Sequence, residues 1–206
     1  MADAKERLYL WLDLETTGDR PTFDDILEVG WFITNEDLAI QHGGENSIVQ
    51  PADHLWQNKM IPIVKEMHEK SGLTADLQRN IHHDDLWMVE SRIIAALHEV
   101  DPHMVCDWVL AGSGVAGFDL QFIKSKMDAL SNLLTYFVID VGQWRRFLRD
   151  ICDVPMEGIS EELAESRAIT HRAYDDIRNH HTEALLYREL IQRFVHPPTL
   201  FTKTGE

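Results

Sequence analysis

The stretch LYLWLDLETTG, residues 8–18, alternates leucine with other side chains and places two acidic residues two positions apart. Side chains on a β-strand point alternately to its two faces. We therefore expect the leucines at positions 8, 10 and 12 on one face, and Asp13 and Glu15 on the other. Thr16, Thr17 and Gly18 follow at once and predict a sharp exit from the strand, where the backbone of a ligand could approach closely.

Two carboxylates at the end of an apolar strand need a compensating charge. Acid-x-acid triplets are common in a chain with 35 acidic residues, so the triplet alone is a weak signal. Its position after a hydrophobic strand is more informative, because buried carboxylates must be neutralised and a divalent cation is the usual means. Asp13 and Glu15 are therefore candidate metal ligands.

The hydrophobic pattern around this strand predicts an α/β domain with a mixed five-stranded sheet flanked by helices. The segment ILEVGWFIT, residues 26–34, is β-branched and apolar enough to be the hairpin partner of the first strand. Further strands are expected at 45–50, 108–111 and 137–141, and helices at 61–70, 84–99, 118–130, 143–151, 160–165 and 172–193. With no repeat or linker, residues 1–196 are expected to form a single domain, and residues 197–206, with paired prolines, a flexible tail.

The composition excludes several classes of protein. The 206 residues include 19 Lys and Arg against 35 Asp and Glu, which gives a net charge of −16, and 44% are hydrophobic, enough for one sizeable core. No apolar run is long enough to cross a membrane and the N-terminus lacks the order of a secretory signal, so we expect a cytoplasmic protein without membrane contact. Cys106 and Cys152 lack the spacing of a disulfide framework or a zinc site. The acidic charge disfavours a long non-specific groove for nucleic acid, but bound cations would still let the protein process it.

A glycine-rich turn leaves the strand expected at 108–111. Its sequence, AGSGVAGFD, residues 111–119, brings Asp119 to the start of the helix expected at 118–130. Ser113 and the glycines suit a cradle for phosphate, while Asp119 could equally cap the helix. The stretch lacks the order of a nucleotide-binding glycine fingerprint.

The segment HRAYDD, residues 171–176, opens the last expected helix. Five residues turn an α-helix by about 500°, so His171 and Asp176 would not share a face of one helix. We expect His171 on the loop before the helix and Asp176 in its first turns. Asp175 and Asp176 could also simply favour the positive helix N-terminus. The adjacent histidines at 82–83 and 180–181 diverge on a helix and lack partners at ligand spacing, so we expect them to be solvated.

Taken together and in this order, Asp13-Leu-Glu15, Val-Ala-Gly-Phe-Asp119 and His171 followed by Asp176 resemble the motifs of the DEDDh 3′-to-5′ exonuclease superfamily, and within it the oligoribonucleases. The resemblance covers nearly the whole chain and implies a ribonuclease H-like exonuclease fold. It also implies a hydrolase that uses two divalent cations, Mg²⁺ or Mn²⁺, to release nucleoside 5′-monophosphates from the 3′ ends of short single-stranded RNA. A homodimer is implied in the same way.

The resemblance also assigns roles to the five motif residues. It implies that Asp13 bridges the two cations, that Glu15 and Asp176 complete the site of one cation, and that Asp119 holds the other. His171 is implied to be the general base. A histidine pKa near 6.5 suits removal of a proton from water at about pH 7 to 8.

Five further residues are expected to contact the substrate. The segment MHEKSGL, residues 67–73, resembles the oligoribonuclease segment whose histidine stacks on a base of the bound dinucleotide, which makes His68 a candidate base contact. From the helical pattern alone, His68 would be a surface histidine. Thr16, Thr17, Gly18 and Ser113 are the other expected substrate contacts.

Several positions depart from the oligoribonuclease pattern. Asp19 stands where these enzymes usually carry a leucine that wedges between bases. Gly142 and Gln143 stand where they carry a Ser-Thr pair that caps the 5′ phosphate, so we expect tolerance of longer strands. The alternative function is a 3′-to-5′ exonuclease of single-stranded DNA or of both nucleic acids. A catalytically idle nucleic-acid-binding module is a third, disfavoured because all five motif residues are present.

Overall fold

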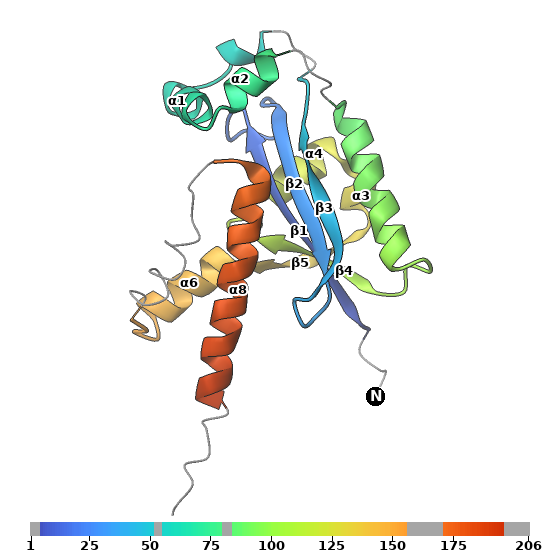
Figure 1. The fold of residues 1–206 in the computed structure, drawn as a ribbon, viewed down its shortest axis with the longest axis vertical. Helices are drawn as coiled ribbons and strands as arrows, with labels where there is room; N and C mark the ends of the chain where they lie inside the picture. The colour runs from blue at the N-terminus through green and yellow to red at the C-terminus, as the bar shows by residue number, and fades with distance from the viewer. Residues whose placement is uncertain (1–4, 52–54, 80–83, 156–170, 196–206) are drawn as a thin grey trace, which may run out of the picture.

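A mixed five-stranded sheet forms the centre of the computed structural model, which describes residues 5–51, 55–79, 84–155 and 171–195. The strand order is β3-β2-β1-β4-β5 (Figure 1). Within it β1 and β2 pair antiparallel, as do β2 and β3, whereas β4 and β5 run parallel to β1. The strands are β1 (Arg7–Thr16), β2 (Ile26–Thr34), β3 (Ile40–Ile48), β4 (Asp107–Gly112) and β5 (Leu134–Asp140).

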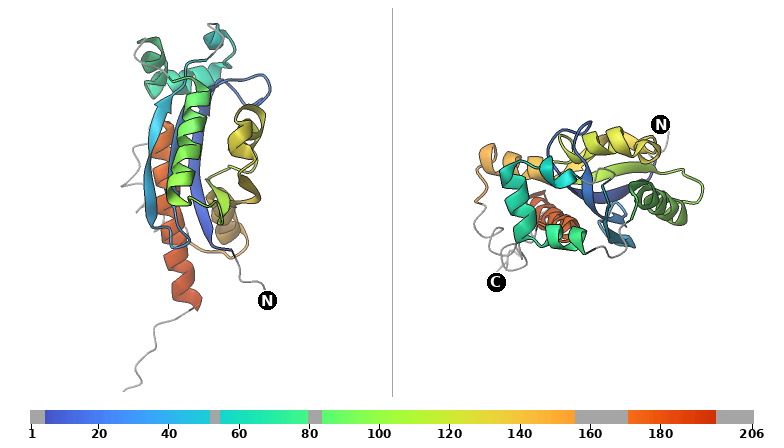
Figure 2. Two further views of the ribbon diagram at one scale, coloured as in Figure 1. Left: turned by 90° about the vertical axis from the view of Figure 1, so that its right-hand side faces the viewer. Right: turned by 90° about the horizontal axis from the view of Figure 1, so that it is seen from above.

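Helices cover both faces of this sheet (Figure 2). On one face lie α3 (Leu86–Val100), α4 (Asp119–Lys126) and α5 (Asp128–Ser131), and on the other α6 (Val141–Asp150) and α8 (Ala173–Val195). At one end of the sheet lie the short helix η1 (Trp56–Asn58), α1 (Pro62–Lys70) and α2 (Leu73–Gln78). No helix among the described residues is long and apolar enough to span a lipid bilayer.

The alternation of β1 decides which helices meet which face. Leu10 and Leu12 are fully buried in the cluster that includes residues of α3, α4 and α5. Trp11 is fully buried in the opposite cluster, with residues of α6 and α8. The predicted assignment of the leucines at positions 8, 10 and 12 to one face is confirmed. The mixed sheet flanked by helices is confirmed as well.

Several element boundaries differ from those expected. The second strand begins and ends at the predicted residues, but β3 starts at Ile40 rather than position 45 because the chain passes the Gly43-Gly44 pair by a register shift, with Gly44 at φ +62°. The helix expected at 118–130 is interrupted at Met127, which has φ −130°. The helix α2 was not predicted. The expected helix at 160–165 and the tail at 197–206 lie outside the described residues.

Candidate active site

The pairing of β1 with β2 fixes the surroundings of the first two acids. Asp13 lies opposite Gly30, and Glu15 lies opposite Glu28. Residues directly opposite each other in an antiparallel pair share a face. All four positions therefore face α8. A register shift after Glu15 ends the regular pairing, an irregularity that is common beside active sites.

Gly30 lets α8 begin directly against the sheet. A Cβ atom at Gly30 would lie 2.3 Å from the backbone nitrogen of Tyr174, so only glycine permits this approach. The backbone N–H of Asp176 donates to the carbonyl of Arg172 at 2.9 Å, which places Asp176 in the first turn of the helix. The close approach therefore delivers the Asp176 carboxylate to the end of β1.

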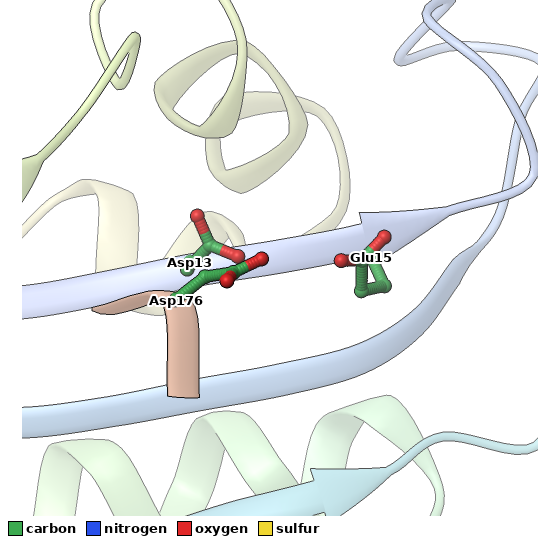
Figure 3. A group of neighbouring side chains, drawn as sticks. All are labelled: Asp13, Glu15 and Asp176. Atoms are coloured by element: carbon green, nitrogen blue, oxygen red, sulfur yellow. The ribbon is translucent and has the colours of Figure 1, made fainter. Parts of the chain in front are cut away.

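Three carboxylates meet at this point. Asp13, Glu15 and Asp176 each offer an oxygen, and these oxygens all lie within 4.8 Å of one another. Figure 3 shows Asp13 and Glu15 projecting from β1 and Asp176 reaching them from α8. Such a set of clustered oxygen ligands suits a hard divalent cation.

Asp119 joins the group from the other side of β1. It is the first residue of α4, is only 2% exposed, and its Oδ1 accepts a hydrogen bond from the backbone N–H of Leu14 at 3.0 Å. The helix N-cap position is Phe118, so the helix-cap alternative for Asp119 is wrong. The turn after β4 delivers Asp119 to the helix start as predicted.

Burial, together with the charges of neighbouring acids, disfavours the ionised form of these carboxylates. Burial, then the charges of Asp119 and Glu15, hold the pKa of Asp13 well above its ordinary value. Burial, then the charge of Asp176, raises the pKa of Glu15 to about 9. Burial raises the pKa of Asp119 to about 7. A bound cation would relieve this repulsion, so the residues fit a divalent metal.

A cleft of about 400 Å³ opens over the carboxylates. Of the expected substrate contacts, Thr16, Gly18 and Ser113 line it. Thr17 does not, and the expectation for this residue is wrong. Its side chain is fully buried, and Thr17 Oγ1 accepts from the backbone N–H of Asp25 at 2.9 Å, which closes the loop between β1 and β2.

His68 differs from both expectations. It is fully buried, so it is not a surface histidine, and no face of its ring is exposed for a base to stack on. Its Nε2 lies 2.8 Å from the Thr16 carbonyl, and its Nδ1 lies 3.7 Å from Glu15 Oε2. The reason is that the inner face of α1 packs over the end of β1. Burial lowers the pKa of His68.

His171 lies immediately before α8, off the helix as predicted. Its backbone has φ +45°, a left-handed conformation that histidine adopts more readily than most residues. The side chain is exposed and lies outside the lining of the cleft. His171 is near enough to His68 to contribute to the lowered pKa of that residue. The structure thus brings the four acids together and holds His171 on the connection that leads to Asp176.

The expectation that the histidines at 180–181 are solvated is wrong. Both are half-buried. His180 Nδ1 lies 4.0 Å from Asp13 Oδ1, and His181 packs edge-on against Trp11 with its Nε2 2.9 Å from the Leu38 carbonyl. His180 follows Asp176 by four residues, and this helical spacing would have placed it at the same site. The histidines at 82–83 lie outside the described residues.

The sequence matches the exonuclease family model over residues 10–183, and the chain therefore belongs to the exonuclease family. Relatives that it is similar to include oligoribonucleases. It is 32% identical over 195 residues to the oligoribonuclease of Nocardia farcinica, covering 94% of this chain and 84% of the relative. It is 33% identical over 184 residues to the mitochondrial oligoribonuclease of Homo sapiens, covering 88% of this chain and 72% of the relative.

Solved structures of exonuclease I share the fold. The zinc-bound complex of E. coli exonuclease I with single-stranded DNA matches with a TM-score of 0.68 at 15% identity, over 93% of this chain and 42% of that chain. Exonuclease I from Methylocaldum szegediense matches with a TM-score of 0.62 at 18% identity, over 91% of this chain and 42% of that chain. The chain therefore spans less than half of these enzymes. At such identities the likeness confirms the exonuclease fold alone.

Proposed function

We propose that this chain is a metal-dependent 3′-to-5′ exoribonuclease that degrades short single-stranded RNA to nucleoside 5′-monophosphates. The observation that carries the proposal is the convergence of Asp13, Glu15 and Asp176 within 4.8 Å of one another in a cleft. The family match supports phosphodiester hydrolysis, and the oligoribonuclease relatives favour short RNA as the substrate.

Two divalent cations, Mg²⁺ or Mn²⁺, would be held by the four acids. Asp13, Glu15 and Asp176, whose carboxylate oxygens cluster, would supply ligands, and so would Asp119, whose charge also acts on Asp13. When bound, such ions neutralise the charge that develops on the phosphate and make water a better nucleophile near neutral pH. The raised pKa values of Glu15 and Asp119 suit this role, because the carboxylates gain most from a compensating charge.

The remaining residues would position the strand and move the proton. His171 would accept a proton from the attacking water, and the 3′ oxygen of the shortened strand would leave in line with it. The apolar side of the cleft, formed by Ile61, Val64 and Met67, would hold the terminal base. Thr16 and Gly18 would lie along the sugar, since both residues line the cleft and Gly18 has no side chain to hinder its approach.

One observation favours strands longer than a dinucleotide. Ser113 lines the cleft and also a second, polar pocket of about 320 Å³ at the start of α6, together with Gly114, Gly142 and Arg146. A Cβ atom at Gly142 would lie 2.7 Å from Ser113 Oγ, so the hydroxyl occupies the space that a side chain there would fill. Upstream phosphates would pass Ser113 and reach the exposed Arg146.

The experiment compares RNA and DNA series from dinucleotide to dodecamer, each incubated with Mg²⁺, Mn²⁺ or EDTA. Cation-dependent release of nucleoside 5′-monophosphates from RNA is expected. Equal rates on DNA would favour the alternative of a dual or DNA-directed exonuclease. Exonuclease I, which shares the fold, has been solved in complex with single-stranded DNA. Absence of hydrolysis from every member under every condition would contradict the proposal.

The proposal extends to a homodimer, on the resemblance to the oligoribonucleases. Light scattering coupled to size-exclusion chromatography should give twice the 23.8 kDa of one chain. A mass of one chain at micromolar concentration would contradict it.

A further inference from the structure

Glu28 is a fifth acid beside the carboxylate cluster. It lies opposite Glu15 in β2, is fully buried, and its charge raises the pKa of Glu15. Position alone would make it another candidate metal ligand. Its hydrogen bonds give it a different role.

Both carboxylate oxygens of Glu28 are already engaged. Arg172 donates to Oε1 from Nε at 2.9 Å and from Nη2 at 2.7 Å, and Asn46 Nδ2 donates to the same oxygen at 2.7 Å. The backbone N–H of Ala173, the first residue of α8, donates to Oε2 at 3.0 Å. Glu28 therefore both pairs with Arg172 and caps the start of α8.

Arg172 connects two elements, β2 and α2, through one guanidinium group. Besides Glu28 in β2, its Nη1 donates to Asp76 Oδ2 in α2 at 2.8 Å. A planar guanidinium with several fixed donors holds such partners in a defined geometry, which a lysine would not reproduce. The backbone of Arg172 is thereby fixed relative to both β2 and α2.

His171 is the next residue along the chain, and it lies in the left-handed region at φ +45°. A residue other than glycine keeps this backbone conformation where its surroundings impose it. Among the described residues no hydrogen bond reaches the His171 ring, whereas Asp176 belongs to a helix that also docks through the buried Ala173 and Ile177. The orientation of His171 thus depends on Arg172 far more than the position of Asp176 does.

We propose that Glu28 and Arg172 form a positioning clamp that orients the general base His171, and that Glu28 is not a metal ligand. The inference rests on the proposed function for the role of His171. It predicts that loss of the clamp acts on the rate of the chemical step through His171, leaving cation binding and substrate binding largely intact.

The test is a double-mutant cycle that combines Arg172→Gln with His171→Ala. Arg172→Gln should lower kcat about tenfold to a hundredfold with KM changed less than about threefold, since a displacement near 1 Å can cost about a hundredfold. In the His171→Ala background the same substitution should lower kcat by less than about twofold. Equal losses in both backgrounds would assign the pair a merely structural role and overturn the proposal.

Matched controls separate positioning from folding. Arg172→Lys keeps the positive charge but not the planar set of guanidinium donors, so its kcat should fall as it does in Arg172→Gln. Arg92→Gln removes a comparable guanidinium pair, with Glu45 and Asp84, on the opposite face of the sheet. It should lower the melting temperature and leave kcat unchanged.

A spectroscopic measurement keeps the test independent of activity. In protein labelled with ¹³C-histidine, the ring resonance of His171, assigned by its loss in His171→Ala, should shift in Arg172→Gln and stay in place in Arg92→Gln. An unchanged His171 resonance in Arg172→Gln would overturn the clamp, even if the wild type proved not to hydrolyse RNA. Inactivity of the wild type with a shifted resonance would instead count against the proposed function alone.

Discussion

Replacement of Gly30 by alanine should displace the start of α8 and, with it, Asp176. The new Cβ would lie 2.3 Å from the backbone nitrogen of Tyr174 and 2.4 Å from the carbonyl carbon of Ala173. Carbon atoms in ordinary contact are about 3.5 Å apart, so the helix start must move by about 1.1 Å. Because β2 is hydrogen-bonded on both sides within the sheet, the helix moves rather than the strand.

A displacement of this size predicts a loss of about a hundredfold in kcat, since catalytic geometry tolerates little misplacement. The concentration of Mn²⁺ that gives half-maximal activity should rise as well, because Asp176 moves away from Asp13 and Glu15. The free energy of unfolding should fall by about 1 to 3 kcal/mol, the usual cost of overpacking.

The assay measures initial rates on a short RNA across a Mn²⁺ titration, with a thermal melt of each variant. Gly43→Ala is the matched control, because a Cβ at Gly43 in the neighbouring strand meets no atom within 4 Å. It should retain wild-type kcat. If Gly30→Ala kept kcat within about threefold of wild type, the close approach would not position the site and the reasoning would be refuted.

Three further predictions concern charge. Asp176→Asn should abolish hydrolysis yet raise the melting temperature of the cation-free protein, because it removes one of the mutually repelling acids; a lower melting temperature would contradict this. The pKa of Glu15 is about 9 in the folded protein, against an ordinary value of 4.5. Between pH 4.5 and 9, the folded cation-free protein therefore keeps a proton on Glu15 that the unfolded chain has released. The free energy of unfolding should therefore fall as pH rises from about 5 to 9 in EDTA, less so in Glu15→Gln, and a stability that rises over this range would count against the carboxylate cluster. Arg146→Ala should raise KM by roughly twofold to fivefold for a hexanucleotide but not for a dinucleotide. Equal effects on both substrates would show that the polar pocket at the start of α6 does not bind upstream phosphates.

The sequence was sufficient to predict β1, the acids at its end and the order of the later motifs. Strand alternation has a period of two, so the face of Asp13 follows directly once Leu10 and Leu12 are assigned to the core. The placement of His171 on the loop before the helix that carries Asp176 followed from helical geometry in the same way. These predictions depend on local spacing, which the sequence displays.

The remaining features depend on contacts between distant segments. His68 is buried because α1 folds over the end of β1, where the Thr16 carbonyl accepts a hydrogen bond from its Nε2. Arg172 and Glu28 are 144 residues apart, so no local pattern joins them. One signal was nevertheless visible: Glu28 is the charged residue within an otherwise apolar strand, which calls for a buried partner of opposite charge.

Stepwise shortening of RNA that carries a label at its 5′ end tests the central claim most directly. With Mg²⁺ or Mn²⁺ the wild-type chain should produce a ladder that shortens by one nucleotide at a time while the label stays on the strand. The ladder should vanish in EDTA and in Asp176→Ala. Early release of the labelled 5′ nucleotide, or a ladder that survives both EDTA and Asp176→Ala, would contradict a cation-dependent 3′-to-5′ exonuclease at this carboxylate cluster.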